Sequence, residues 1–309
     1  MMRLRIDLAY DGGAYYGWAR QPDLPTVQGE IEDALHTVLR VPAGSQEEPL
    51  RLTVAGRTDT GVHAAGQICH LDMSEVTLEA CRGHMDLPAT QALMNRLNHR
   101  LPADIRILDI QEAPAGFNAR FSALERTYVY RISDGSMPVD PRLRSFVLSL
   151  DDRLDIDLMN QAAAMIPGLH DFGSFSTPNP GGTTIREVKL AYWSRIGERS
   201  LVGEGSGVSA ENQQAGHFTV PSMESGLLCF TIVADAFAHN MVRSLVKACV
   251  VIGRHRKSLD WFAQKLEVPL REGSTGPIEA RGLTLEHVAY PPDDQLAVRS
   301  EAIRAKRTL

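Results

Sequence analysis

Apolar and polar side chains alternate along residues 4–10, a spacing that is typical of a strand with one buried face. Residues 27–40 instead repeat apolar side chains every three or four positions, which predicts a helix with Thr26 as its N-cap. The same two periods predict the rest of the first half: strands over 50–55, 67–73 and 105–110, and a helix over 88–100 that Pro102 ends.

The second half of the chain repeats this order of elements. The spacing predicts strands over 127–132, 187–196, 227–234 and 283–290, and helices over 156–166, over 241–252 and from Ser258. Each half therefore has the order β-α-β-β-α-β, which is the ferredoxin-like arrangement. We expect an α+β fold in which the two halves join into one long mixed, largely antiparallel sheet. Helices would cover one face, and the other face would be free to hold a large substrate.

The predicted domains follow from this repetition. An N-terminal ferredoxin-like half would span 1–115, a C-terminal half 116–295, and a basic tail 296–309. Residues 198–216 are rich in Gly, Ser and Gln, and we expect them to form a flexible hairpin insertion in the second half.

Composition narrows the classes of protein that fit. The formal net charge of −6 argues against attraction of the whole molecule to nucleic acid, yet residues 236–259 hold five cations and no acid. No segment approaches the ~20 apolar residues that span a bilayer, and the N-terminus lacks the apolar stretch of a signal peptide. The four cysteines form no Cys-x-x-Cys pair. We therefore expect a cytoplasmic protein that has no membrane segment, no metal site and no cofactor.

Residues 55–64 (Ala-Gly-Arg-Thr-Asp-Thr-Gly-Val-His-Ala) form the most informative segment. Its carboxylate, Asp59, has Arg57 close by and a glycine on each side in the sequence. The Asp59 side chain could accept hydrogen bonds from the loop amides as an Asx-turn, or it could be catalytic. The loop alone does not decide between these roles. Its Asp-Thr-Gly tripeptide also occurs in aspartic proteases, but their chemistry needs a second such carboxylate, and the chain has no second Asp-Thr/Ser-Gly.

Two further segments contain candidate site residues. Residues 235–244 connect a strand to a helix and place Arg243 in the first turns, where an arginine could also be simply solvated. Residues 126–130 place Tyr128 and Tyr130 on one strand face, where cross-strand packing is the alternative explanation.

Taken together, these segments resemble the tRNA pseudouridine synthase A family, in order and over nearly the whole chain. The resemblance rests on residues 10–12 with 15–21, 55–63, 117–122, 126–130, 236–243 and 282–285. It implies that uridines at positions 38–40 in the anticodon arm of tRNA are isomerised to pseudouridine by a homodimeric enzyme.

The same resemblance implies roles for individual residues. Asp59 would be the catalytic carboxylate, acting as nucleophile or base, and Arg243 would pair with it. Arg57 would help to displace the target base from its stem, while Tyr128 and Leu285 would contact that base. A non-catalytic RNA-binding or RNA-chaperone protein on the same sheet, with Asp59 inert, is the alternative.

Overall fold

The computed structural model describes residues 1–42, 44–45, 49–136, 139–178, 182–200, 219–220 and 222–302. Most of the insertion predicted at 198–216 lies outside these residues. Within the described part of the chain, no helix is long and apolar enough to cross a membrane. The same residues contain no cluster of three or more His, Cys, Asp or Glu side chains that could hold a metal ion.

The N-terminal half contains every element that the hydrophobic pattern predicts. In β1 (Met2–Tyr10), Leu4, Ile6 and Leu8 are fully buried. At the start of α1 (Val27–Leu39), the Thr26 hydroxyl accepts a hydrogen bond from Gly29 N at 3.2 Å, as expected of an N-cap. The elements of this half are β1 (Met2–Tyr10), α1 (Val27–Leu39), β2 (Thr53–Val54), β3 (His63–Met73), α2 (Glu75–Arg82), α3 (Ala89–Arg100) and β4 (Ile105–Glu112).

The short helix α2 was not expected, because its eight residues bury only Leu78 and Cys81 and so show little helical periodicity.

The C-terminal half also follows the predicted order, with short additions. Its principal elements are β5 (Glu125–Ser133), α4 (Ile156–Ala163), β8 (Ile185–Arg195), β11 (Leu228–Ala234), α6 (Met241–Gly253), α7 (Leu259–Glu267) and β12 (Leu283–Ala289). The additions are β6 (Leu148–Ser149), β7 (Gly168–Asp171), β9 (Arg199–Ser200), β10 (Thr219–Val220) and α8 (Leu296–Ala302). The boundary predicted between residues 115 and 116 lies in the connection from β4 to β5, and the division into domains stays a prediction.

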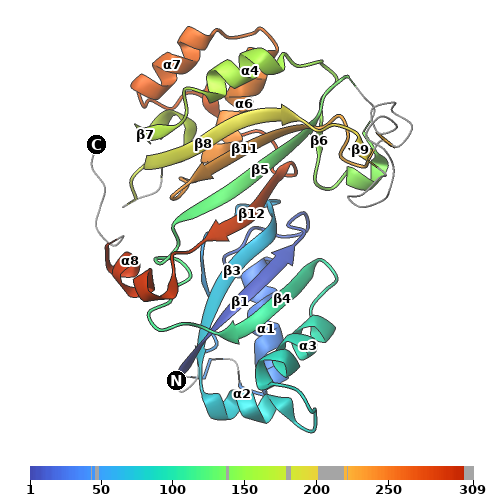
Figure 1. The fold of residues 1–309 in the computed structure, drawn as a ribbon, viewed down its shortest axis with the longest axis vertical. Helices are drawn as coiled ribbons and strands as arrows, with labels where there is room; N and C mark the ends of the chain where they lie inside the picture. The colour runs from blue at the N-terminus through green and yellow to red at the C-terminus, as the bar shows by residue number, and fades with distance from the viewer. Residues whose placement is uncertain are drawn as a thin grey trace, which may run out of the picture.

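One ten-stranded sheet runs through both halves, in the order β4-β1-β3-β12-β5-β11-β8-β7 (Figure 1). β2 pairs with only two residues of β3, His70 and Cys69, so the beginning of the same β3 edge is left open. β12 occupies that edge in parallel orientation, opposite His63 and Ala64. Apart from this junction and the β5–β6 pair, the strand pairs of the sheet in the described residues are antiparallel. The predicted mixed, largely antiparallel sheet is confirmed.

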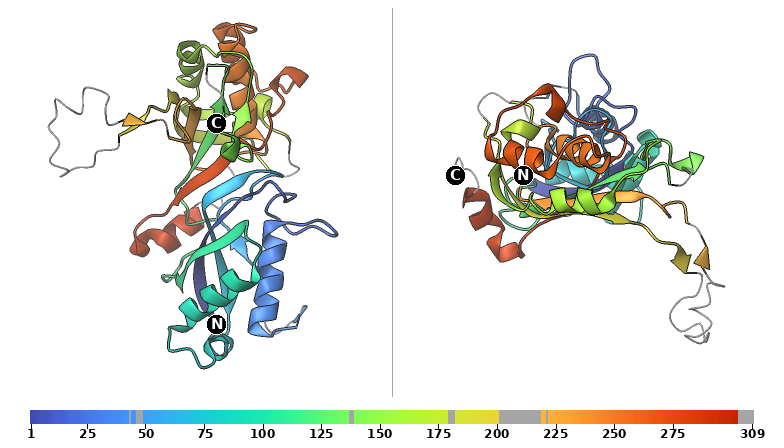
Figure 2. Two further views of the ribbon diagram at one scale, coloured as in Figure 1. Left: turned by 90° about the vertical axis from the view of Figure 1, so that its right-hand side faces the viewer. Right: turned by 90° about the horizontal axis from the view of Figure 1, so that it is seen from above.

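The helices pack in two groups, one for each half of the sheet. Helices α1, α2 and α3 contact one another, and α4 contacts both α6 and α7. Figure 2 shows α1 on one side of the sheet and α8 on the other. Leu296, at the start of α8, is 1% exposed, and its carbonyl accepts a hydrogen bond from Ser122 Oγ. An ordered helix therefore begins where the basic tail was predicted, while residues 303–309 lie outside the described part.

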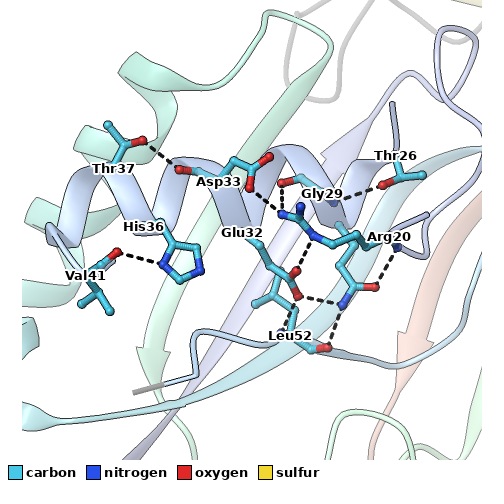
Figure 3. A network of polar contacts seen from close by, with 10 residues as sticks. Arg20, Thr26, Gly29, Glu32, Asp33, His36, Thr37, Val41 and Leu52 are labelled. Carbon is cyan, nitrogen blue, oxygen red and sulfur yellow. Dashed lines mark hydrogen bonds and ion pairs between the residues drawn. The ribbon is translucent and has the colours of Figure 1, made fainter. Parts of the chain in front are cut away.

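A polar network at α1 connects this helix to two segments that lead to the site (Figure 3). The Glu32 carboxylate, in a residue only 6% exposed, accepts hydrogen bonds from Arg20 Nε at 2.9 Å and Leu52 N at 3.1 Å. Gln28 donates a third at 2.7 Å. Because Arg20 precedes α1 and Leu52 precedes β2, one buried carboxylate holds both segments against the helix.

Glu32→Ala is expected to lower the free energy of unfolding by about 3 kcal/mol, because it leaves Arg20 without its buried partner and Leu52 N without an acceptor. Urea denaturation measures this change. Asp33→Ala is the matched control: its carboxylate also binds Arg20, at 2.6 Å, but its side chain is 66% exposed, so the loss should stay below about 1 kcal/mol. Equal losses for the two variants would contradict the assigned importance of Glu32.

Candidate active site

The loop of residues 55–62 is held in place by β1, by β3 and by the segment before α1. Gln67 Nε2 donates a hydrogen bond to Gly56 O at 2.8 Å, and Trp18 N donates one to Thr58 O at 3.0 Å. The hydroxyl groups of Tyr10 and Thr58 lie 2.8 Å apart in a further hydrogen bond. These contacts fix the loop on a rigid scaffold and leave its tip to the solvent side.

The tip of the loop is a turn closed by the backbone, from Val62 N to Asp59 O at 3.1 Å. Gly17 packs directly against it: at φ +88° it has a conformation that favours glycine, and an added Cβ would lie 2.8 Å from Thr58 O. Within the described residues, the Asp59 carboxylate accepts no hydrogen bond from the loop amides. The turn therefore does not need this side chain, which counts against the Asx-turn explanation.

Asp59 instead faces a cavity of about 330 Å³. The cavity is lined by Tyr16, Trp18, Ala19, Gln21, Arg57, Thr58, Asp59, Thr60, His239, Asn240 and Arg243. These residues come from the segment before α1, from the loop after β2 and from the start of α6, so both halves of the chain contribute. Among the described residues of this lining, Asp59 is the one acid, and Arg57, His239 and Arg243 are the basic side chains.

The structure brings Asp59 and Arg243 to one cavity without a direct ion pair between them. Within the described residues, no Arg243 nitrogen lies within 4.0 Å of the Asp59 carboxylate. Arg243 Nε donates to Ile278 O at 2.7 Å and Nη1 to Asn240 Oδ1 at 3.2 Å. Burial lowers the pKa of Arg243 from its ordinary value, while the charge of Asp59 acts in the opposite direction. The predicted pairing of Arg243 with Asp59 stays a prediction.

His239 is the residue that pairs with Asp59 in the structure, with its Nε2 3.5 Å from Asp59 Oδ1. The neighbouring Asn240 has a positive φ of 63°, which is uncommon for a residue other than glycine. Its Nδ2 donates to Thr177 Oγ1 at 2.8 Å, and Thr177 N donates to His239 O at 2.9 Å. The segment before α6 is therefore held in an unusual backbone conformation beside the carboxylate.

The three other predicted residues lie in different surroundings. Arg57 is exposed and lines the cavity, and it makes no hydrogen bond or ion pair within the described residues. Tyr128 is 7% exposed, with the Phe237 ring packed edge-on at 5.0 Å, and burial raises its pKa above the ordinary range. Leu285 is fully buried opposite Tyr128. Neither Tyr128 nor Leu285 lines the cavity.

Four residues that line the cavity were not predicted as site residues: His239, Asn240, Tyr16 and Trp18. All four fall in segments that carried the family resemblance, 15–21 and 236–243, so their positions were marked but their roles were not. No periodicity brings these two segments together, because they are more than 200 residues apart.

His239→Gln is expected to reduce the rate of catalysis by no more than about fivefold, since a half-exposed ion pair contributes at most about 1 kcal/mol. Single-turnover kinetics on the tRNA substrate would measure it. His255→Gln is the matched control, because His255 lies at the same 3.5 Å from Asp155 but outside the cavity. A hundredfold loss for His239→Gln alone would show that His239 acts on the substrate itself.

Comparison with known proteins agrees with this geometry. Residues 162–291 match the family model described as tRNA pseudouridine synthase. A tRNA pseudouridine synthase A of Bifidobacterium longum is 64% identical over all of both chains. Proteins of that name from Streptomyces avermitilis and Mycobacterium leprae are 43% and 39% identical, over at least 99% of this chain and at least 95% of theirs. The chain belongs to the tRNA pseudouridine synthase A family.

Proposed function

We propose that this protein is a tRNA pseudouridine synthase that isomerises uridine to pseudouridine at positions 38–40 of the anticodon stem-loop, with Asp59 as its catalytic carboxylate. The observation that carries this proposal is the cavity itself. One carboxylate, free of the hydrogen bonds of its own turn, faces a space lined by two arginines and a histidine. At about 330 Å³ the cavity is at the lower end of the range for small-ligand sites, about 300–1,000 Å³.

The reaction breaks the C–N glycosidic bond, rotates the uracil and rejoins it to the ribose through C5. The base must first leave its stack, at a cost of a few kcal/mol. An aromatic side chain can offset about 1–3 kcal/mol of this by stacking. Tyr16 lines the cavity with 49% of its surface exposed, so its ring is accessible to a base. Tyr128, being only 7% exposed, can offer only a small part of its ring.

The basic residues of the cavity suit an anionic RNA. Arg57 extends from the loop with no partner among the described residues, so it is free to contact a phosphate or to occupy the space left by the displaced base. Arg243 lies deeper, bonded to Ile278 O and Asn240. Its remaining donor groups are available to Asp59 or to the substrate.

Tritium release from tRNA transcripts that contain [5-³H]uridine tests the function, because the new C–C bond displaces the hydrogen at C5. Three transcripts would each keep one uridine among positions 38, 39 and 40, and a fourth would keep none. Release from the first three and not from the fourth is expected. Binding of all four without any release would instead support the non-catalytic RNA-binding alternative.

A homodimer is part of the same proposal, since a second subunit would enlarge the surface available to a tRNA. Light scattering in solution should then give twice the mass of one chain. A cytoplasmic location, expected from the sequence, also stays a prediction.

A further inference from the structure

Arg126 is a buried arginine that does not line the cavity, and the proposed reaction gives it no role. It is only 7% exposed. Its guanidinium donates to three main-chain carbonyl groups: Ala55 O at 2.7 Å, Arg120 O at 2.9 Å and Asp235 O at 2.5 Å. Burial lowers the pKa of Arg126, and within the described residues no carboxylate forms an ion pair with it. A charge buried in this way is unfavourable unless its N–H groups are bonded, so the position needs an explanation.

The three carbonyl groups belong to the segments that build the site. Ala55 lies four residues before Asp59, and Asp235 lies four residues before His239. Arg120 belongs to the connection between the two halves. The guanidinium also lies beside Gly56 in the loop: a Cβ added to this glycine would be 4.0 Å from Arg126 Nε.

The backbone around Arg126 is well fixed. Arg126 pairs with Ala234 of β11 and with Val288 of β12, in the interior of the sheet. Arg126 and Tyr128 are two residues apart on the buried face of β5. Asp235 Oδ1 accepts from Ala236 N at 2.7 Å and from Glu187 N at 3.1 Å, which orients the segment that Arg126 holds.

We propose that Arg126 is a positioning residue that sets the distance between the Asp59 loop and the segment leading into α6. This inference rests on the proposed function. The guanidinium is planar and rigid, so it fixes the direction as well as the length of its bonds to Ala55 O and Asp235 O. A lysine would keep the charge but could not reproduce this planar arrangement of donors. A displacement of about 1 Å between reacting groups can lower a rate by about 10²-fold.

The test compares Arg126→Lys and Arg126→Ala with Arg3→Lys. Arg3 also donates to a main-chain carbonyl, Phe117 O at 2.6 Å, and pairs with Asp72. Unlike Arg126, it bonds to neither the Asp59 loop nor the segment leading into α6. Tritium release gives kcat and KM, filter binding gives the tRNA dissociation constant, and thermal unfolding reports stability. In Arg126→Lys, kcat should fall about 100-fold while the dissociation constant changes less than about threefold. In Arg3→Lys, kcat should stay within about twofold of the wild-type value even where stability falls.

Chemical rescue separates positioning from general stability. Ethylguanidinium should raise kcat of Arg126→Ala by about tenfold, whereas ethylammonium should not, because only the former restores the planar donors. If Arg126→Ala does not fold without the added compound, it is assayed with ethylguanidinium present throughout. Failure of ethylguanidinium to restore turnover would overturn the proposal.

The two hypotheses fail in different ways. A wild-type protein that releases no tritium would refute the proposed function. An active wild-type protein whose Arg126→Lys variant keeps the wild-type kcat, or loses kcat only in proportion to tRNA binding, would refute the positioning role.

Discussion

Asp59→Asn is expected to abolish pseudouridine formation, lowering the rate by at least about 10⁴-fold, as the loss of a covalent or general-base group does in other enzymes. Asparagine has nearly the same shape but no negative charge and no basic oxygen. Because the turn is closed by Val62 N and Asp59 O, and not by the carboxylate, the loop should keep its conformation in the variant.

Binding should survive the same substitution. The Asp59 side chain is 32% exposed and lies among basic residues, so its charge repels phosphate groups more than it holds them. We expect the tRNA dissociation constant to change by less than about tenfold, equivalent to about 1.4 kcal/mol. Tritium release and filter binding measure the two quantities, with Asp33→Asn on α1 as the control. Full activity of Asp59→Asn would remove this residue from the reaction.

Arg243→Ala is the second large effect, with an expected fall in kcat of about 10²–10³-fold, the range seen when one fixed donor is removed from a charged transition state. The bonds to Ile278 O and Asn240 Oδ1 hold the guanidinium beside the cavity before any substrate arrives. Arg243→Lys should recover only part of the rate, because an ammonium group cannot make both bonds in the same plane.

Lys247→Ala provides the control for Arg243, since it removes a cation from the same helix one turn further on and outside the cavity. Its kcat should stay within about twofold of the wild-type value. If Arg243→Ala also turned over at the wild-type rate, Arg243 would have no part in the site.

The secondary structure was largely predictable because each half buries one face of its sheet. Burial of one face imposes a period of two on strands such as β1 and a period of 3.6 on helices such as α1. Short elements were less predictable. α2 buries only Leu78 and Cys81 and was not predicted, and the strand predicted over 50–55 is only two residues long, Thr53–Val54.

The site was predictable only in part. The sequence marked Asp59, Arg57 and Arg243, and all three line one cavity. It did not predict that His239 would pair with Asp59, nor that Arg243 would bond to Ile278 O. It also could not predict that Tyr128 and Leu285 are buried and do not line the cavity, because the burial of a strand residue depends on which elements pack over it.

By itself, the sequence determined the order of elements and the N-cap of α1. It also marked Asp59, which has Arg57 close by and a glycine on each side. These features depend only on residues that are neighbours along the chain. The tertiary structure decided the rest. The parallel pairing of β12 with the open edge of β3 joins the halves, and this junction brings residues 55–62 against the start of α6. Only then do Asp59 and His239 lie within 3.5 Å and the carbonyls of Ala55 and Asp235 share one guanidinium. Contacts across more than 100 residues depend on sheet order and register, which local patterns along the chain do not specify.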